Sequence, residues 1–135
     1  MTFVVGVLSP STHRVEVLSA GHGPILVYSA ADDGMHEVEP QGLPLGIMKG
    51  VSYDEPTEVE LQPGDFLLLT TDGFFEWANP QGELFGKERL IESALRAKSR
   101  TSAEIIKSIY NDVITFSGGT PQDDDVTAVV VKRKA

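Results

Sequence analysis

The stretch Phe66-Leu67-Leu68-Leu69-Thr70-Thr71-Asp72-Gly73 decides the fold of this chain. Its apolar residues fill both sets of alternating positions, which is typical of a strand buried on both faces in the centre of a sheet. Asp72 follows this strand at once, and Gly73 allows the backbone to turn sharply beside it. We therefore expect a carboxylate at the mouth of a central strand.

A second acidic motif, Asp123-Asp124-Asp125-Val126-Thr127, comes just before the last apolar run of the chain. Three adjacent carboxylates repel one another, and a hard cation bound through their oxygens relieves this repulsion. Taken alone, either motif is also compatible with an ordinary turn or a merely acidic loop. If the fold brings Asp72 and Asp124 together, the chain holds half of a metal site.

The residues before the central strand predict more β-structure. Runs of apolar or alternating residues, separated by turn signals, predict strands at 3–8, 14–18, 25–28, 35–38 and 53–61. The segment Gly42-Leu43-Pro44-Leu45-Gly46 is expected to be a loop with buried leucines, and Gln62-Pro63-Gly64-Asp65 a tight turn. The first two-thirds of the chain thus predict a sheet or a sandwich.

The last third of the chain changes to a helical period. Residues 87–98 carry one apolar helical face, formed by Leu90, Ile91, Ala94 and Leu95. Thr101-Ser102-Ala103-Glu104 is a capping box that opens a second helix. The apolar stripe of that helix consists of Ile105, Ile109, Val113 and Phe116. Gly118-Gly119-Thr120-Pro121 ends it, and a buried strand at 126–131 follows, with Lys132-Arg133-Lys134 trailing into solvent. Two helices over one face of a sheet give an α+β layered domain.

The composition excludes several classes of protein. The chain has 135 residues, enough for one domain with a buried core, and no cysteine for disulfides or thiolate metal sites. Its formal charge of −9 argues against binding to nucleic acid or to anionic membrane surfaces. We find no signal peptide and no apolar run of the ~20 residues that span a bilayer, so a cytoplasmic location without membrane insertion is expected.

An ordered set of short segments resembles a known family. The segments are Ala20-Gly21-His22-Gly23-Pro24, Gly42-Leu43-Pro44-Leu45-Gly46, Leu61-Gln62-Pro63-Gly64-Asp65, Thr70-Thr71-Asp72-Gly73-Phe74-Phe75-Glu76, Phe85-Gly86 and Asp124-Asp125-Val126-Thr127. Together they resemble the catalytic domain of bacterial SpoIIE/RsbU-type serine phosphatases, which are metal-dependent (PPM, 2C-like) protein phosphatases. The resemblance covers nearly the whole chain.

This resemblance implies a layered β-sandwich flanked by helices, with a binuclear Mn²⁺ or Mg²⁺ centre whose bridging water attacks phosphorus. It implies that Asp72 and Asp124 are catalytic metal ligands, and that Asp125 orients a ligand or water at the metal. Gly73 is expected to let substrate or loop backbone approach. His22 is expected to be a hydrogen-bonded scaffold residue, the alternative being a general acid for the leaving serine oxygen. The implied substrate is a phosphorylated regulatory protein, such as an anti-sigma factor antagonist.

The chain departs from the family pattern at its beginning. The family carries an early Asp-x-x-Gly-Lys/His-Gly type segment whose carboxylate bridges two metals, and this sequence has none. We therefore expect residues 1–135 to be the C-terminal two-thirds of a phosphatase domain, weakly active or inactive alone. Apolar sheet surface left uncovered would favour a homo-oligomer.

Two other functions are alternatives to the phosphatase. One is a non-catalytic phosphatase-like domain that serves as a regulatory or docking surface. The other is a cupin-like ligand-binding barrel, which the three isolated histidines and the helical last third disfavour.

Overall fold

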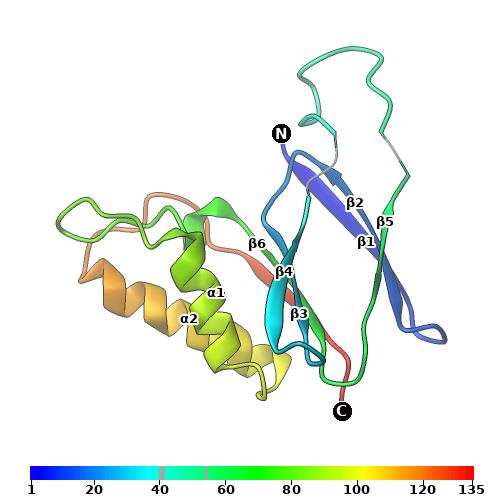
Figure 1. Cartoon of the computed structure of the whole chain (residues 1–135). Helices are drawn as coiled ribbons and strands as arrows, with labels where there is room; N and C mark the ends of the chain where they lie inside the picture. The colour runs from blue at the N-terminus through cyan, green and yellow to red at the C-terminus, as the bar shows by residue number, and fades with distance from the viewer. Residues whose placement is uncertain (40–41, 54) are drawn as a thin grey trace.

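The computed structural model describes residues 1–39, 42–53 and 55–135. Within them the chain forms two antiparallel sheets and two α-helices (Figure 1). One sheet has the order β1-β2-β5, formed by Phe3–Ser9, Arg14–Ala20 and Thr57–Glu60. The other has the order β4-β3-β6-β7, formed by Gly34–Val38, Ile25–Ser29, Phe66–Thr70 and Ala128–Lys132. The predicted α+β sandwich is confirmed.

The two sheets pack face to face through one apolar cluster. Val15 and Val17 of β2 and Val59 of β5 belong to the same buried cluster as Ile25 and Leu67 of the second sheet. Because side chains alternate along a strand, the residues between them, such as Glu16 and Glu58, face away from the cluster and are exposed. This alternation makes the first sheet one outer layer of the molecule.

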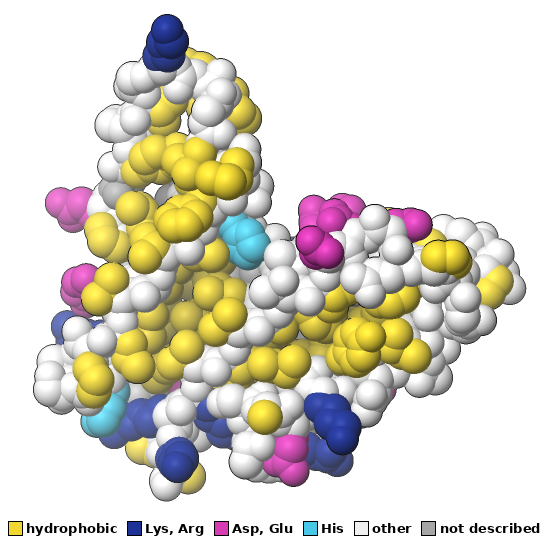
Figure 2. Space-filling view, turned by 180° about the vertical axis from the view of Figure 1, so that it is seen from behind, with side chains coloured by type: hydrophobic (Ala, Val, Ile, Leu, Met, Phe, Trp, Pro, Cys, Tyr) yellow, Lys and Arg dark blue, Asp and Glu magenta, His cyan; other side chains and the backbone are white. Residues whose placement is uncertain are grey.

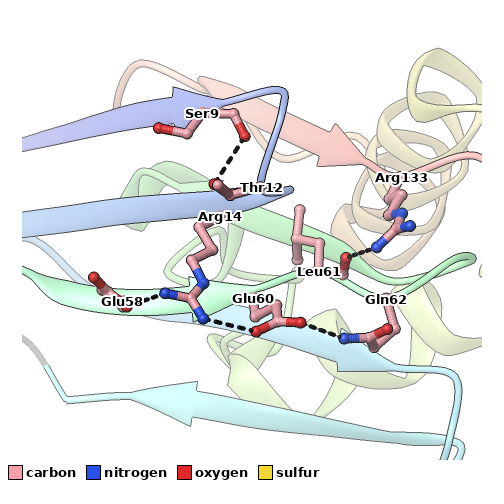
Figure 3. A network of polar contacts seen from close by, with 8 residues as sticks. All are labelled: Ser9, Thr12, Arg14, Glu58, Glu60, Leu61, Gln62 and Arg133. Carbon is pink, nitrogen blue, oxygen red and sulfur yellow. Dashed lines mark hydrogen bonds and ion pairs between the residues drawn. The ribbon is translucent and has the colours of Figure 1, made fainter.

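A polar network ties β5 to its surroundings on this side (Figure 3). The Arg14 guanidinium donates to the carboxylates of Glu58 at 3.2 Å and Glu60 at 3.4 Å. Beyond the end of β5, the guanidinium of Arg133 donates to the carbonyl of Leu61 at 2.8 Å. Arg133 therefore does not trail into solvent, as the sequence had suggested, but joins the end of β7 to the first sheet.

β6 is the central strand that the sequence predicted. It lies between β3 and β7, with Leu68 opposite Leu26 on one side and Val130 on the other. Leu68 packs in the cluster beneath the helices, and Leu67 packs in the cluster between the sheets. Burial on both faces fixes the path of β6 and hence the position of the residues that follow it.

The helices α1 (Gly86–Arg96) and α2 (Ser102–Ser117) cover the outer face of the second sheet (Figure 1). Fully buried helix residues in this layer are Leu90, Ala94, Ile105, Ile109 and Val113. The capping box is present, because Thr101 Oγ1 accepts from the Glu104 N–H and the Glu104 carboxylate accepts from the Thr101 N–H. α2 ends at Gly118, which has a left-handed φ of 57°. The predicted helices are thus confirmed.

Three details of the sequence prediction were wrong. The leucines of the 42–46 loop are not buried, since Leu43 is 44% exposed. The strand predicted at 53–61 is shorter in the structure and consists of β5 alone, because only four residues of β2, Arg14 to Val17, pair with it. Part of that prediction, Asp54, lies outside the described residues. The last strand is an edge strand and not a buried one, because β7 pairs with β6 alone among the described strands and leaves Val129 48% exposed.

Candidate metal centre

Asp72 opens a short 3-10 helix, η1 (Asp72–Phe74), two residues after the end of β6 at Thr70. The carbonyl of Asp72 accepts hydrogen bonds from the N–H groups of Phe75 at 3.0 Å and Glu76 at 2.8 Å. These bonds fix the backbone of the turn, while the Asp72 carboxylate makes no hydrogen bond or ion pair with any residue that the structure describes. The turn therefore presents a free carboxylate at the end of the central strand, as predicted.

Two threonines join this turn to the second acidic motif. The N–H of Thr71 donates to the carbonyl of Thr127 at 3.0 Å, and the N–H of Thr127 donates to Thr71 Oγ1 at 3.0 Å. The same hydroxyl donates to the carbonyl of Asp125 at 2.9 Å. We call these three bonds the threonine clasp. It joins residues 56 positions apart, and it places the Asp124-Asp125 backbone beside η1.

Gly73 is the point of closest approach between the two motifs. A Cβ atom at this position would lie 2.4 Å from the Asp125 carbonyl oxygen and 3.3 Å from that of Asp124. Real Cβ atoms are not found so close to backbone oxygen, so no larger residue fits here without moving the loop. Of the two groups that Gly73 was expected to admit, the described structure shows the loop backbone.

The Asp124 carboxylate is oriented by its own loop. Its Oδ1 accepts from the N–H of Asp125 at 2.6 Å, and the Asp124 carbonyl accepts from Gln122 Nε2 at 2.8 Å. Asp124 and Asp125 are both exposed. Figure 2 shows acidic side chains gathered on one upper rim of a notch in the surface. The loop thus offers carboxylate oxygens to solvent, with no basic side chain paired to them in the described part of the chain.

A small hollow lies beside Asp72. Its volume is about 220 Å³, and its lining includes His22, Asp72 and Glu76. The backbone of His22 is fixed by Ser19, whose Oγ donates to the His22 carbonyl at 2.7 Å and accepts from its N–H at 2.9 Å. The imidazole itself makes no hydrogen bond in the described chain. The backbone of His22 is thus hydrogen-bonded, its ring lines the hollow, and the scaffold role of the side chain stays a prediction.

The donor set suits a hard cation in kind. Asp72 and Asp124 supply carboxylate oxygens, and backbone carbonyls lie beside them, which are the ligands that Mg²⁺ and Mn²⁺ prefer. The number of ligands is low for a protein metal site, because no group of three or more His, Cys, Asp or Glu side chains in the described residues is arranged to hold a metal. Two carboxylates are fewer ligands than a bridged pair of cations requires, so such a pair would need a further carboxylate.

Sequence reasoning missed the threonine clasp and the anchor of the acidic loop. The indole N–H of Trp77 lies 3.2 Å from both the carbonyl and the hydroxyl of Thr120, just before that loop. Trp77 is buried, so this bond joins the acidic loop to the core beneath the helices. The threonines beside the aspartates mark hydroxyls that can bond to backbone, but the sequence does not indicate that their partners lie 56 positions away.

Comparisons with known proteins show what this chain is similar to. The family model described as Stage II sporulation protein E (SpoIIE) matches residues 1–134. The chain is 31% identical over 124 residues to phosphoserine phosphatase RsbU of Bacillus subtilis, covering 90% of this chain and 36% of RsbU. It is 29% identical over 133 residues to protein IcfG of Synechocystis, covering 98% of this chain and 20% of IcfG.

Solved structures give the same picture. The RsbU and RsbW domains of Rv1364c from Mycobacterium tuberculosis match with a TM-score of 0.76 and 28% identity, over 99% of this chain and 37% of that one. The SpoIIE phosphatase domain of Bacillus subtilis, presoaked with Mn, matches with a TM-score of 0.74 and 21% identity, over 98% of this chain and 56% of that one. The chain therefore spans about half of that solved domain and about a third or less of the curated relatives.

Proposed function

Because this chain belongs to the SpoIIE family of metal-dependent phosphatases, we propose that it forms part of the active site of a phosphoserine/phosphothreonine protein phosphatase. The observation that carries the proposal is the threonine clasp, which holds the Asp72 turn against the Asp124 loop. In this proposal the carboxylates of Asp72 and Asp124, which are distant in the sequence, serve one metal site, as a metal-dependent hydrolase requires.

In this proposal Asp72 and Asp124 bind Mn²⁺ or Mg²⁺, and Asp125 supports them through its backbone. The Asp125 N–H holds the Asp124 carboxylate in place at 2.6 Å, and its carbonyl is bound to Thr71 at 2.9 Å. When bound, such a metal supplies an activated water as the nucleophile and neutralises charge on the phosphoryl oxygens. Gly73 keeps the turn close enough to the loop for both carboxylates to serve one site.

The proposed substrate is a phosphorylated regulatory protein of the anti-sigma factor antagonist type. Two relatives support this class: one is named a phosphoserine phosphatase, and another carries RsbU and RsbW domains in one chain. The acidic rim argues for a substrate that approaches with a metal in place, since two bare carboxylates would repel a phosphate group.

A non-catalytic regulatory domain is the second candidate. It is favoured by the donor count, because the described residues hold no group of three metal-binding side chains. Metal binding separates the two candidates, since a domain released from chemistry has no need for a cation between Asp72 and Asp124.

Two further expectations accompany the proposal. Self-association through apolar sheet surface is supported by β1, an edge strand on which Phe3, Val5 and Val7 are exposed. No helix in the part of the chain described here is both long enough and apolar enough to cross a membrane. The cytoplasmic location expected from the sequence stays a prediction.

The test is hydrolysis of a phosphoserine peptide with and without Mn²⁺, by this chain and by a longer protein that contains it. The proposal predicts Mn²⁺-dependent turnover in the longer protein and weak or no turnover by the folded chain alone. Asp72→Asn and Asp124→Asn in the longer protein should each abolish turnover, while Asp123→Asn in the same loop should leave it within about twofold. Full turnover in the Asp72→Asn variant would refute the assignment.

A further inference from the structure

A second, larger cavity lies at the opposite end of the β4-β3-β6-β7 sheet from Asp72. Its volume is about 550 Å³, and its lining includes the α1–α2 connection and the end of β7. In the sheet, Lys132 pairs with Phe66 at this end and Ala128 pairs with Thr70 at the metal end. Four steps along the strand at ~3.3 Å each separate the two ends by roughly 13 Å. The cavity is therefore distinct from the candidate metal centre.

The cavity is lined by basic side chains in an acidic protein. Lys98, Arg100, Lys132 and Lys134 all line it, and no Asp or Glu is among its lining residues. The chain as a whole has a formal charge of −9. Figure 2 shows Lys and Arg side chains along the lower edge of the molecule, away from the acidic rim. Basic side chains thus gather around the cavity at the end of the sheet opposite Asp72.

Two of these four cations are already used by the protein. Lys98 forms an ion pair with Asp33, and its ammonium lies 5.9 Å from the centre of the Tyr28 ring. The Lys132 ammonium donates to the carbonyls of Lys98 and Arg100, the latter at 2.8 Å. Desolvation by burial lowers the pKa of Lys132 below its usual value. These two lysines build the wall of the cavity and hold the α1–α2 connection onto β7.

The other two cations have no such partner. Arg100 and Lys134 form no ion pair and no side-chain hydrogen bond within the described residues. The nearby carboxylate of Glu104 is bound to the N–H and hydroxyl of Thr101 at 3.0 and 2.7 Å. Two exposed cationic side chains therefore line the cavity without a carboxylate side chain paired to them among the described residues.

The rest of the lining suits an organic group beside the anion. Tyr28 is buried, and with Ala30 and Gly64 it gives the cavity an apolar side. Ser99, Thr101 and Ser102 add hydroxyl groups, and Ala135 completes the lining. A volume of about 550 Å³ exceeds the needs of a bare phosphate and lies in the usual range for small-molecule sites, roughly 300–1,000 Å³.

We propose that this cavity binds a small organic phosphate, of the size and charge of a nucleoside diphosphate, through Arg100 and Lys134. Guanidinium and ammonium groups bind phosphate oxygens by charge-assisted hydrogen bonds, and the apolar side accepts the organic body. The site is separate from the phosphatase chemistry proposed above, because it uses neither Asp72 nor Asp124 and requires no metal. It gives the domain a place where a cellular phosphate compound binds far from the reaction.

The test is calorimetric titration of the folded chain with ADP and with pyrophosphate, in low salt and with EDTA present. EDTA removes metal from the candidate centre, so any binding reports on the cavity. The cavity variant is Arg100→Gln/Lys134→Gln. The matched control is Lys49→Gln/Lys107→Gln, which removes the same charge from two exposed lysines that do not line the cavity.

ADP is expected to bind the unaltered chain and the control variant with affinities within about threefold of each other. The cavity variant should bind at least about tenfold more weakly, because each charge-assisted hydrogen bond is worth about tenfold in affinity. ADP should also bind more tightly than pyrophosphate, since only ADP fills the apolar side. No ADP binding at millimolar concentration, equal weakening in both variants, or equal affinity for pyrophosphate would each overturn the proposal.

Discussion

Replacing Thr71 by valine tests the threonine clasp, and Thr70 provides the control one residue away. Thr71 Oγ1 accepts from the Thr127 N–H at 3.0 Å and donates to the Asp125 carbonyl at 2.9 Å. Thr70 Oγ1 is buried and has no hydrogen-bond partner among the residues that the structure describes. The same substitution therefore removes two hydrogen bonds at one position and an unsatisfied hydroxyl at the next.

The expected effects on stability have opposite signs. A net hydrogen bond contributes ~0.5–1.5 kcal/mol, so Thr71→Val should lower the free energy of unfolding by about 1–3 kcal/mol. Thr70→Val should leave it unchanged or raise it by up to about 1 kcal/mol, because burial of an unpaired hydroxyl is unfavourable. Thr71→Val should also weaken Mn²⁺ binding, since the clasp positions the Asp124 loop.

Urea unfolding followed by the fluorescence of Trp77, the single and buried tryptophan, measures both variants. Circular dichroism in the absence of urea checks that each variant is folded. Equal destabilisation by the two substitutions, or unchanged stability and Mn²⁺ affinity in Thr71→Val, would refute the role given to the clasp.

Three further substitutions probe the turn, the core and the helix cap. Gly73→Ala should destabilise the fold by about 1–3 kcal/mol through overpacking. Gly6→Ala is the control, because its Cβ would meet its nearest atom at 3.5 Å, and it should change stability by less than about 0.5 kcal/mol in the same urea assay. Equal costs in the two variants would contradict the close approach at Gly73. Asp65→Asn should lower the free energy of unfolding by about 1–3 kcal/mol, because this buried carboxylate accepts from the N–H groups of Ala30 at 2.7 Å and Gln62 at 2.8 Å. An unchanged unfolding midpoint would contradict this role of Asp65. Hydrogen bonds from Thr101 lower the pKa of Glu104 from its usual value of 4.5. The stability that ionised Glu104 contributes is therefore present above pH 4.5 and is lost as the pH falls through the lowered pKa. Glu104→Gln should reduce the slope of stability against pH in that acid range, and an identical slope would contradict this role.

The elements that the sequence predicted correctly are those fixed by local chemistry. β6 is central because an unbroken apolar run can only be buried on both faces. The start of α2 follows from the reciprocal bonds of Thr101 and Glu104, which lie three residues apart. Both signals are contained in one short segment, so no knowledge of distant partners was needed.

The errors arose where distant partners decide the structure. The leucines at 42–46 were expected to be buried because they are apolar, but this loop is held to the rest of the chain by backbone pairing of Leu45 with Met1 and remains on the surface. β7 has a buried strand's composition and yet is an edge strand, so Val129 is exposed. Composition indicates whether a residue favours burial, but it does not indicate which distant segment will cover it.

The candidate site also combines features that the local sequence predicts with features that depend on distant residues. The sequence indicated Asp72 and Asp124 as oxygen ligands, but their meeting was conditional on the fold. The threonine clasp that brings the motifs together joins residues 56 positions apart, and no local pattern specifies such a bond. The basic cavity was missed because its four cations come from two separate segments and the sequence placed the second of these in solvent.

The central claim is that Asp72 and Asp124 hold one divalent cation together. Titration of the folded chain with Mn²⁺, followed by calorimetry or by the loss of the free Mn²⁺ electron paramagnetic resonance signal, tests it most directly. Asp72→Asn and Asp124→Asn should each weaken Mn²⁺ binding at least about tenfold, the double variant should lose little more than either, and Asp123→Asn should stay within about twofold. Equal small losses in all three single variants would mean that Mn²⁺ binds only a diffuse acidic surface, and would contradict the account.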